Sequence, residues 1–177
     1  SKIKSLFGLF NYSHMEFDQL RDRSIDGEPS LSEMTEAAIR ILSKHDKGFV
    51  LLVEGGLIDQ AHHRGYASLS LYEVLEFDRA IRKARKLLPK QDTLFLVTAD
   101  HSQPLVINGY SVRGNRINGL SRRKDGNQLP FTTLSYTSGP GFQTTVQRSN
   151  MTNVTLEQAT RKFVLFYNQF NYHLTLH

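Results

Sequence analysis

The fold is indicated first by one stretch, Phe49-Val-Leu-Leu-Val-Glu-Gly-Gly-Leu-Ile-Asp-Gln-Ala-His-His63. Its first five residues form a continuous apolar run that is partly β-branched and preceded by Gly48. A short run of this kind is typical of a strand buried on both faces, as in a parallel sheet. A second run, Thr93-Leu-Phe-Leu-Val-Thr98, has the same character and leads into Ala99-Asp100-His101. We therefore predict two buried strands, each followed directly by polar residues.

Helical patterns accompany these strands. Ser30-Leu-Ser-Glu33 has the form of a capping box, and the apolar spacing after it predicts a helix that ends near Lys44. A second helix is predicted over roughly 68–88, where Pro89 stops it. Its apolar stripe is expected at Leu71, Val74, Phe77, Ile81 and Ala84. The order helix, strand, helix, strand predicts an α/β fold with a central, mostly parallel sheet flanked by helices.

Outside this central part the patterns are weaker. Residues 7–10 read as the end of a strand, residues 131–136 as a strand, and residues 156–170 as an amphipathic helix. We interpret residues 1–149 as one partial domain that carries the functional residues. Residues 150–177 are interpreted as a divergent C-terminal tail.

Composition excludes several classes of protein. The formal net charge is +5, but the basic residues are not interleaved with aromatic ones, so we expect no nucleic-acid partner. The chain has no cysteine, which excludes disulfides and thiolate zinc sites. No apolar run approaches membrane-spanning length. Glycosylation triplets begin at Asn11, Asn150 and Asn153 and favour an extracellular or cell-surface protein.

Five polar residues lie where α/β sheets place their function, just beyond the carboxyl ends of strands. Glu54 follows the first predicted strand, and Asp100 and His101 follow the second. Asp59 and His63 are four residues apart, so on a helical turn they share one face and can bind one ion. Carboxylate and imidazole together suit zinc, whereas a carboxylate with waters suits magnesium.

Each of these features has a plainer interpretation when it stands alone. Asp59 and His63 could be a surface pair, Glu54 a carboxylate favoured by a helix N-terminus, and Asp100-His101 a turn. His62 is expected to be exposed or an outer partner of the site. At the ends of two neighbouring strands, however, the five residues together favour a metal site.

The two motifs resemble a known family. Val53-Glu-Gly-Gly-Leu-Ile-Asp-Gln-Ala-His-His63 is similar to the alkaline phosphatase segment V-E-G-G-x-I-D-x-x-H-H. Leu96-Val-Thr-Ala-Asp-His-Ser102 is similar to the T-A-D-H-S segment of the same family, and the spacing between the two also fits. The likeness covers roughly residues 7–142 and is closest to animal members, of which this chain resembles a piece of the C-terminal half.

The resemblance implies a fold, an activity and a set of ligands. Glu54 becomes the magnesium ligand, Asp59 and His63 hold one zinc, and Asp100 and His101 hold the second. The implied reaction is hydrolysis of phosphate monoesters through a phosphoserine. The family also implies a homodimer at the cell surface, with a lipid anchor left open, in which Tyr110 would reach the partner subunit.

Departures from the family pattern are equally informative. The nucleophilic serine, an aspartate that bridges two metals and the phosphate-binding arginine are expected N-terminal to Ser1, so this chain alone is expected to be inactive. No segment after Tyr136 supplies the expected third histidine for the first zinc, and Gln103 stands where many members have a histidine. Asn11 replaces the usual carboxylate of the animal calcium site, which argues against calcium.

Two alternative functions remain open, and the V-E-G-G segment counts against the first of them. One is another enzyme of the same superfamily, such as a phosphodiesterase or a phosphomutase. The other is a catalytically inactive metal-binding or structural fragment, which the missing nucleophile favours.

Overall fold

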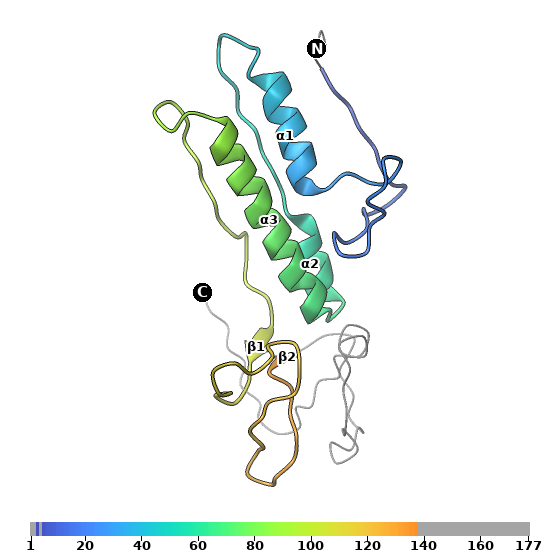
Figure 1. The fold of residues 1–177 in the computed structure, drawn as a ribbon, viewed down its shortest axis with the longest axis vertical. Coiled ribbons are helices and arrows are strands. Elements are labelled where there is room, and N and C mark those ends of the chain that lie inside the picture. Colours follow the sequence, from blue (N-terminus) through green and yellow to red (C-terminus); the bar gives the residue numbers. More distant parts are fainter. Residues whose placement is uncertain (1–2, 4, 138–177) are drawn as a thin grey trace. The chain divides into compact units, whose positions relative to one another are not determined.

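The computed structural model describes residue 3 and residues 5–137, which fall into two compact units. Unit 1 is formed by Ser1–Gln60 and Leu69–Ser102, and unit 2 by Ala61–Ser68 together with the chain from Gln103 onward. Figure 1 shows three helices followed by two short strands along the described chain. The helix expected over 156–170, the tail from residue 150, and Asn150 and Asn153 lie outside the described residues.

Helix α1, Leu31–Leu42, confirms the predicted helix and its capping box. The Oγ of Ser30 accepts a hydrogen bond from the Glu33 N–H at 3.2 Å, and the Glu33 carboxylate accepts one from the Ser30 N–H at 2.7 Å. Two of the N–H groups that the start of a helix leaves unpaired are thereby satisfied. Thr35 and Ile39 form its buried side.

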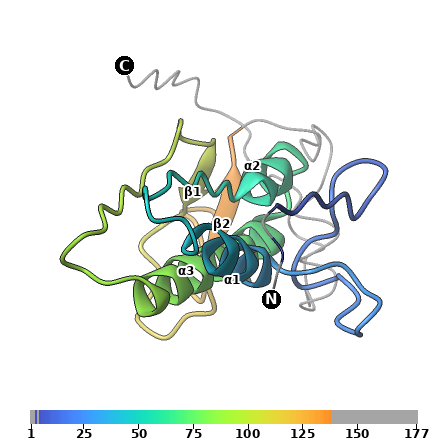
Figure 2. The same ribbon diagram turned by 90° about the horizontal axis from the view of Figure 1, so that it is seen from above.

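Helix α3, Ala67–Leu87, confirms the second predicted helix but not its buried stripe. Residues 67–70 at its start are all buried, and beyond them the buried positions are Glu73, Glu76 and Ala80, whereas Val74 is exposed. These positions recur at helical spacing, so α3 has one coherent buried face. That face includes two carboxylates, which are hydrogen-bonded by Asp18 in the loop before α1, by Ser32 of α1 and by Arg79 of α3 itself. Figures 1 and 2 show α1 and α3 side by side, and Lys83 of α3 pairs with Glu36 of α1 at 2.7 Å.

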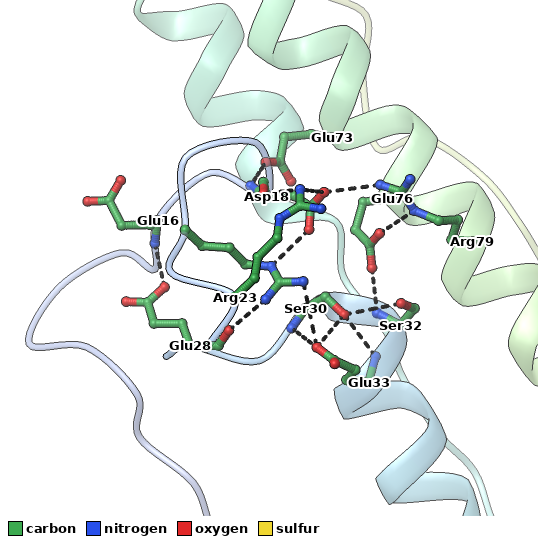
Figure 3. Close-up of polar contacts among 11 residues, drawn as sticks. Glu16, Asp18, Arg23, Glu28, Ser30, Ser32, Glu33, Glu73, Glu76 and Arg79 are labelled. Carbon is green, nitrogen blue, oxygen red and sulfur yellow. Dashed lines mark hydrogen bonds and ion pairs between the residues drawn. The ribbon is translucent and has the colours of Figure 1, made fainter. Parts of the chain in front are cut away.

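Asp18 is the centre of the charged network that covers α3 (Figure 3). Its side chain is only 7% exposed, and its carboxylate accepts hydrogen bonds from Arg21 at 2.9 Å and from Arg79 at 3.0 Å. The N–H of Asp18 donates to Glu73 at 2.6 Å, and Arg23 adds a longer contact of 3.3 Å. A buried carboxylate is tolerated when it is paired and hydrogen-bonded in this way.

Glu76 extends the network to the start of α1. It accepts hydrogen bonds from the Ser32 N–H at 2.9 Å and from Arg79 at 2.5 Å. Burial alone raises the pKa of Glu76, but the hydrogen bonds from Ser32 and Arg79 outweigh it and leave the pKa lowered. Glu76 is therefore held in its charged form between the two helices.

Glu73 behaves in the opposite way and yields a pH-dependent prediction. Burial raises the pKa of Glu73; the Asp18 N–H lowers it, and the charges of Asp18 and Glu76 raise it further. The ionised form therefore costs stability, and this cost grows as pH rises from the unfolded value near 4.5 through the folded pKa. Glu73→Gln keeps an oxygen acceptor without the charge, so the variant should melt at a higher temperature than the parent at pH 7.

The thermal midpoints of parent and variant, compared at pH 7 and at pH 4, test this expectation. The gain should shrink towards zero at pH 4, where Glu73 binds a proton in both states. Glu16→Gln, at an exposed position in the loop that contains Asp18, is the control. A variant that is less stable than the parent at pH 7 would show that the charge of Glu73 is needed.

The mostly parallel sheet is the main point on which the described structure differs from the sequence-based expectation. Residues 7–10, 49–53 and 93–98 are not assigned to hydrogen-bonded strands. Residues 49, 51, 53, 93 and 95 are half-buried, whereas Val50 and Leu94, on the opposite side of the extended chain, are 96% and 81% exposed. Burial on both faces is therefore not seen among the described residues, and the mostly parallel sheet stays a prediction. A strand needs neighbouring strands for its hydrogen bonds and for its second covered face.

Unit 2 contains the described strands, β1 at Leu105–Ile107 and β2 at Leu134–Tyr136. They pair antiparallel, with Leu105 opposite Tyr136 and Ile107 opposite Leu134. The predicted strand over 131–136 is thus confirmed in its second half. Asn108 continues the pairing, because its side-chain amide donates to the Thr132 carbonyl at 3.0 Å and to the Ser135 hydroxyl at 2.8 Å.

Helix α2, Gly56–His63, ends in a left-handed glycine turn. Gly65 has φ +70°, its N–H donates to the His62 carbonyl at 2.9 Å, and the Tyr66 N–H donates to the Ala61 carbonyl at 2.8 Å. This pair of bonds is the Schellman motif, which satisfies carbonyls that a helix end leaves unpaired. Glycine fits here because a side chain makes this backbone conformation unfavourable.

Gly65→Ala should therefore destabilise the protein by about 1–2 kcal/mol, the cost of a left-handed conformation for a residue with a Cβ. A clash contributes little, since the new Cβ would lie 4.0 Å from the nearest atom, on Tyr136. Urea denaturation measures the free energy of unfolding. Gly126→Ala is the matched control, because Gly126 has open space around it and is not among the residues with positive φ. Equal effects of the two substitutions would contradict the role of the turn.

Candidate metal centre

The structure brings together residues from both sequence motifs within unit 1. His101 Nε2 lies 3.6 Å from a carboxylate oxygen of Asp59 and 3.2 Å from one of Asp100. Asp59 is on α2, whereas Asp100 and His101 follow the extended segment that ends at Thr98. Two carboxylates therefore converge on one imidazole nitrogen. His101 and Asp100 are largely exposed, so the group is open to solvent.

The other ring nitrogen of His101 orients the side chain. Nδ1 lies 3.0 Å from the carbonyl oxygen of Ser102, and since a carbonyl only accepts, Nδ1 carries the hydrogen. In the neutral imidazole this leaves the Nε2 lone pair on the side of the two carboxylates, which is the arrangement a metal ligand requires. The Ser102 carbonyl, followed by the charge of Asp100, raises the pKa of His101.

His63 and Glu54 lie near the two ends of α2. His63 is exposed at the last residue of the helix, four residues after Asp59 and therefore on the same helical face. Glu54 is exposed just before the helix, and its carboxylate lies 3.5 Å from where a Cβ on Gly56 would stand. Glu54 thus sits beside the N-terminus of α2, where a negative charge is favourable.

The donor chemistry of these residues suits the metals predicted from the sequence, but the described residues do not complete a site. Asp59, Asp100, His63 and His101 supply oxygen and nitrogen donors of the kind that zinc prefers. Within residue 3 and residues 5–137, however, no group of three or more potential ligands is arranged to hold an ion. Zinc prefers about four ligands, so each pair would need donors from elsewhere.

One residue of this region was not identified from the sequence. Tyr136 of β2 is 1% exposed, and its hydroxyl lies 2.8 Å from Nδ1 of His62. His62 is half-buried, so it fits the expected outer partner better than a free surface histidine. Sequence signals placed Tyr136 at the end of a strand but gave no indication of its partner, because the two residues are far apart along the chain.

Comparison with known proteins decides the family. A sequence model described as alkaline phosphatase matches residues 1–175. The chain belongs to the alkaline phosphatase family. It is 48% identical over 136 residues to a membrane-bound alkaline phosphatase of Bombyx mori, with 77% of this chain and 24% of that protein covered. Tissue-nonspecific alkaline phosphatases of Rattus norvegicus and Homo sapiens are both 47% identical, over 144 and 142 residues.

The matches to these alkaline phosphatases cover about four-fifths of this chain but only about a quarter of each relative. The shares are 81% and 27% for the Rattus norvegicus protein, and 80% and 27% for the Homo sapiens protein. The chain thus spans about a quarter of the length of the curated relatives it matches. Among its described residues, no helix is both long and apolar enough to cross a membrane.

The residue at the calcium-related position takes part in hydrogen bonding instead. The side-chain amide of Asn11 donates to the Glu28 carboxylate at 2.6 Å, and the same carboxylate accepts from the Glu16 N–H at 2.7 Å. The Asn11 side-chain oxygen accepts a hydrogen bond from the Ser13 N–H at 3.3 Å. The argument against calcium therefore remains the sequence-based one, the replacement of a carboxylate by Asn11.

Proposed function

We propose that this chain is the metal-ligand part of an alkaline phosphatase that hydrolyses phosphate monoesters with two zinc ions and one magnesium ion. Asp59 and His63 would hold one zinc, Asp100 and His101 the second, and Glu54 the magnesium. The proposed reaction passes through a phosphoserine formed on a serine outside these 177 residues. A phosphate-binding arginine is likewise supplied from outside them.

The observation that carries this proposal is the approach of Asp59 and His101. These residues come from different motifs, yet His101 Nε2 and an Asp59 oxygen are 3.6 Å apart. Two zinc ions in a phosphatase stand about 3.5–4 Å apart, so their ligand sets must also be neighbours. The contact between the two proposed ligand pairs supports adjacent sites, and the family membership supports the reaction class.

Bound metals would supply charge for the transferring phosphoryl group and for the leaving oxygen. The contribution of this chain is to hold the donors in place. The Ser102 carbonyl keeps neutral His101 in the tautomer whose Nε2 lone pair can bind a metal. The first turn of α2 orients Asp59. Glu54 beside the N-terminus of α2 offers a hard oxygen, as magnesium requires.

The proposal also includes a mostly parallel sheet, a homodimer and a location at the cell surface. Residues 49–53 and 93–98 would join a mostly parallel sheet whose other strands lie outside the described residues, which would cover the open face at Val50 and Leu94. A homodimer is supported by Tyr110, which is 92% exposed. We place the protein at the cell surface; Asn11 is exposed, as a glycan acceptor must be.

The test uses the protein produced from its complete reading frame. Hydrolysis of p-nitrophenyl phosphate at alkaline pH should be at least 100-fold faster than that of bis(p-nitrophenyl) phosphate, and a chelator should abolish it. Added zinc and magnesium should restore the activity. The 177-residue chain alone should hydrolyse the monoester no faster than a metal-ion blank, since it lacks the nucleophile and the phosphate-binding arginine.

Other outcomes identify the alternatives. Faster hydrolysis of the diester would indicate a phosphodiesterase of the same superfamily. No hydrolysis of either ester, with metals bound, would indicate a metal-binding protein without catalytic activity. Chelator-sensitive monoester hydrolysis by the 177-residue chain alone would overturn the assignment of the nucleophile to a segment outside it.

A further inference from the structure

The end of α2 is connected to β2 by a partly buried side-chain contact within unit 2. The Tyr136 hydroxyl and Nδ1 of His62 are 2.8 Å apart, and the two rings meet edge to face with centroids 5.7 Å apart and an interplanar angle of 68°. Ala61, which precedes His62 on the helix, is fully buried. The contact thus combines a hydrogen bond with aromatic packing.

Tyr136 is the rigid partner in this pair. It is held in the ladder opposite Leu105, and the next N–H along the chain, that of Thr137, donates to the Pro104 carbonyl at 2.9 Å. Both Tyr136 and Leu134 are 1% exposed. A side chain in this position has little freedom, so its hydroxyl is a fixed point for whatever binds to it.

The last turn of α2 needs such a fixed point. The helix has eight residues, fewer than the roughly 12–15 that an isolated helix needs to be even marginally stable. His62 and His63 are adjacent, so their side chains leave the helix about 100° apart. A partner that fixes His62 therefore also fixes the rotation of the turn that presents His63, without touching His63 itself.

We propose that Tyr136 is a positioning residue for the metal ligand His63, acting through its hydrogen bond to His62. The proposal rests on the proposed function, which makes His63 a zinc ligand. A direct hydrogen-bond partner of a ligand is worth about 10–100-fold in metal affinity, and this range is the upper limit for Tyr136, which acts through the neighbouring His62. Tyr136 needs no contact with substrate or metal for this role.

The experiment compares Tyr136→Phe with the parent in the protein from the complete reading frame. Phenylalanine keeps the ring and its packing but removes the hydroxyl. Zinc affinity is measured by competition with a chromophoric chelator, and the visible spectrum of the Co²⁺-loaded protein reports the geometry around the metal. We expect about 10-fold weaker binding of one zinc, the lower end of the range for a direct partner, and an altered Co²⁺ spectrum, with the second zinc unchanged.

Two further variants make the result specific. His62→Phe removes the other half of the hydrogen bond, so it should weaken the same zinc, and combining it with Tyr136→Phe should add little. Tyr12→Phe, which removes the hydroxyl of a fully exposed tyrosine, should change neither the affinity nor the spectrum.

Parent-like zinc affinity and an unchanged Co²⁺ spectrum in Tyr136→Phe would overturn the proposal. So would a loss of zinc that is matched by loss of the folded circular-dichroism signal of the metal-free protein, because the tyrosine would then act on folding alone. Failure of the proposed function is recognised separately, since His63→Ala would then retain both zinc ions.

Discussion

Replacing His63 or His101 with alanine is expected to remove one zinc from the full-length protein and to lower phosphate monoester turnover by more than about 100-fold. Loss of an outer partner of a ligand already costs about 10–100-fold, and loss of the ligand itself should cost more. Each variant should lose a different zinc, because the two histidines belong to different proposed pairs. Metal content per chain, measured by mass spectrometry of the dialysed protein, provides the test.

Glu54→Ala and His45→Ala complete this series. Glu54→Ala should keep both zinc ions and lose magnesium, because magnesium depends on hard oxygen ligands. His45 is exposed and has no proposed role, so its replacement should leave metal content unchanged. Retention of two zinc ions by both the His63 and the His101 variants would show that the ligand assignment is wrong and that only the fold is shared with the family.

Asp18→Ala should be the most damaging substitution for stability among the charged residues of unit 1, with an expected loss of about 2–4 kcal/mol. Removing one partner of a buried ion pair costs about 3–5 kcal/mol, and part of this cost is relieved here because Arg79 is half exposed. The loss also removes the hydrogen bonds from Arg21 and Arg23. Urea denaturation of the variant and the parent gives the difference in free energy of unfolding.

Asp78→Ala is the matched control. Asp78 pairs with Arg82 at 2.7 Å on α3, but both side chains are largely exposed. Exposed pairs contribute about 0.2–1 kcal/mol, so the control should change stability much less than Asp18→Ala. If both variants lost a similar free energy of unfolding, burial would not make the ion pairs of Asp18 more important for stability than an exposed pair.

The helices could be predicted because their signals are local. The capping box at Ser30 and Glu33 is complete within four residues, and Pro89 stops α3 just beyond its last residue. The buried face of α3 could not be predicted, because hydropathy marks Val74 as core and Glu73 as surface. Glu73 is buried because the backbone N–H of Asp18, in a loop 55 residues earlier in the sequence, donates a hydrogen bond to its carboxylate. The spacing of residues along α3 carries no information about this contact.

The candidate site was predictable to a similar extent. Spacing placed Asp59 and His63 on one helical face, and the family likeness supplied their role. Neither the spacing nor the family likeness indicated that Tyr136 contacts His62, because that contact depends on how β2 packs against the end of α2. The expected sheet likewise depends on neighbouring strands, and a local pattern such as residues 49–53 cannot show whether those neighbours are present.

The open apolar side of residues 50, 52, 94 and 96 also governs how the chain behaves at high concentration. With a net charge of +5, molecules of the chain repel one another at low ionic strength. Salt shortens the range of this repulsion to about 10 Å at 0.1 M, while it leaves the attraction between apolar surfaces in place. The colloidal stability of the isolated chain is therefore greatest in dilute buffer, whereas covering the apolar face would make it less sensitive to salt.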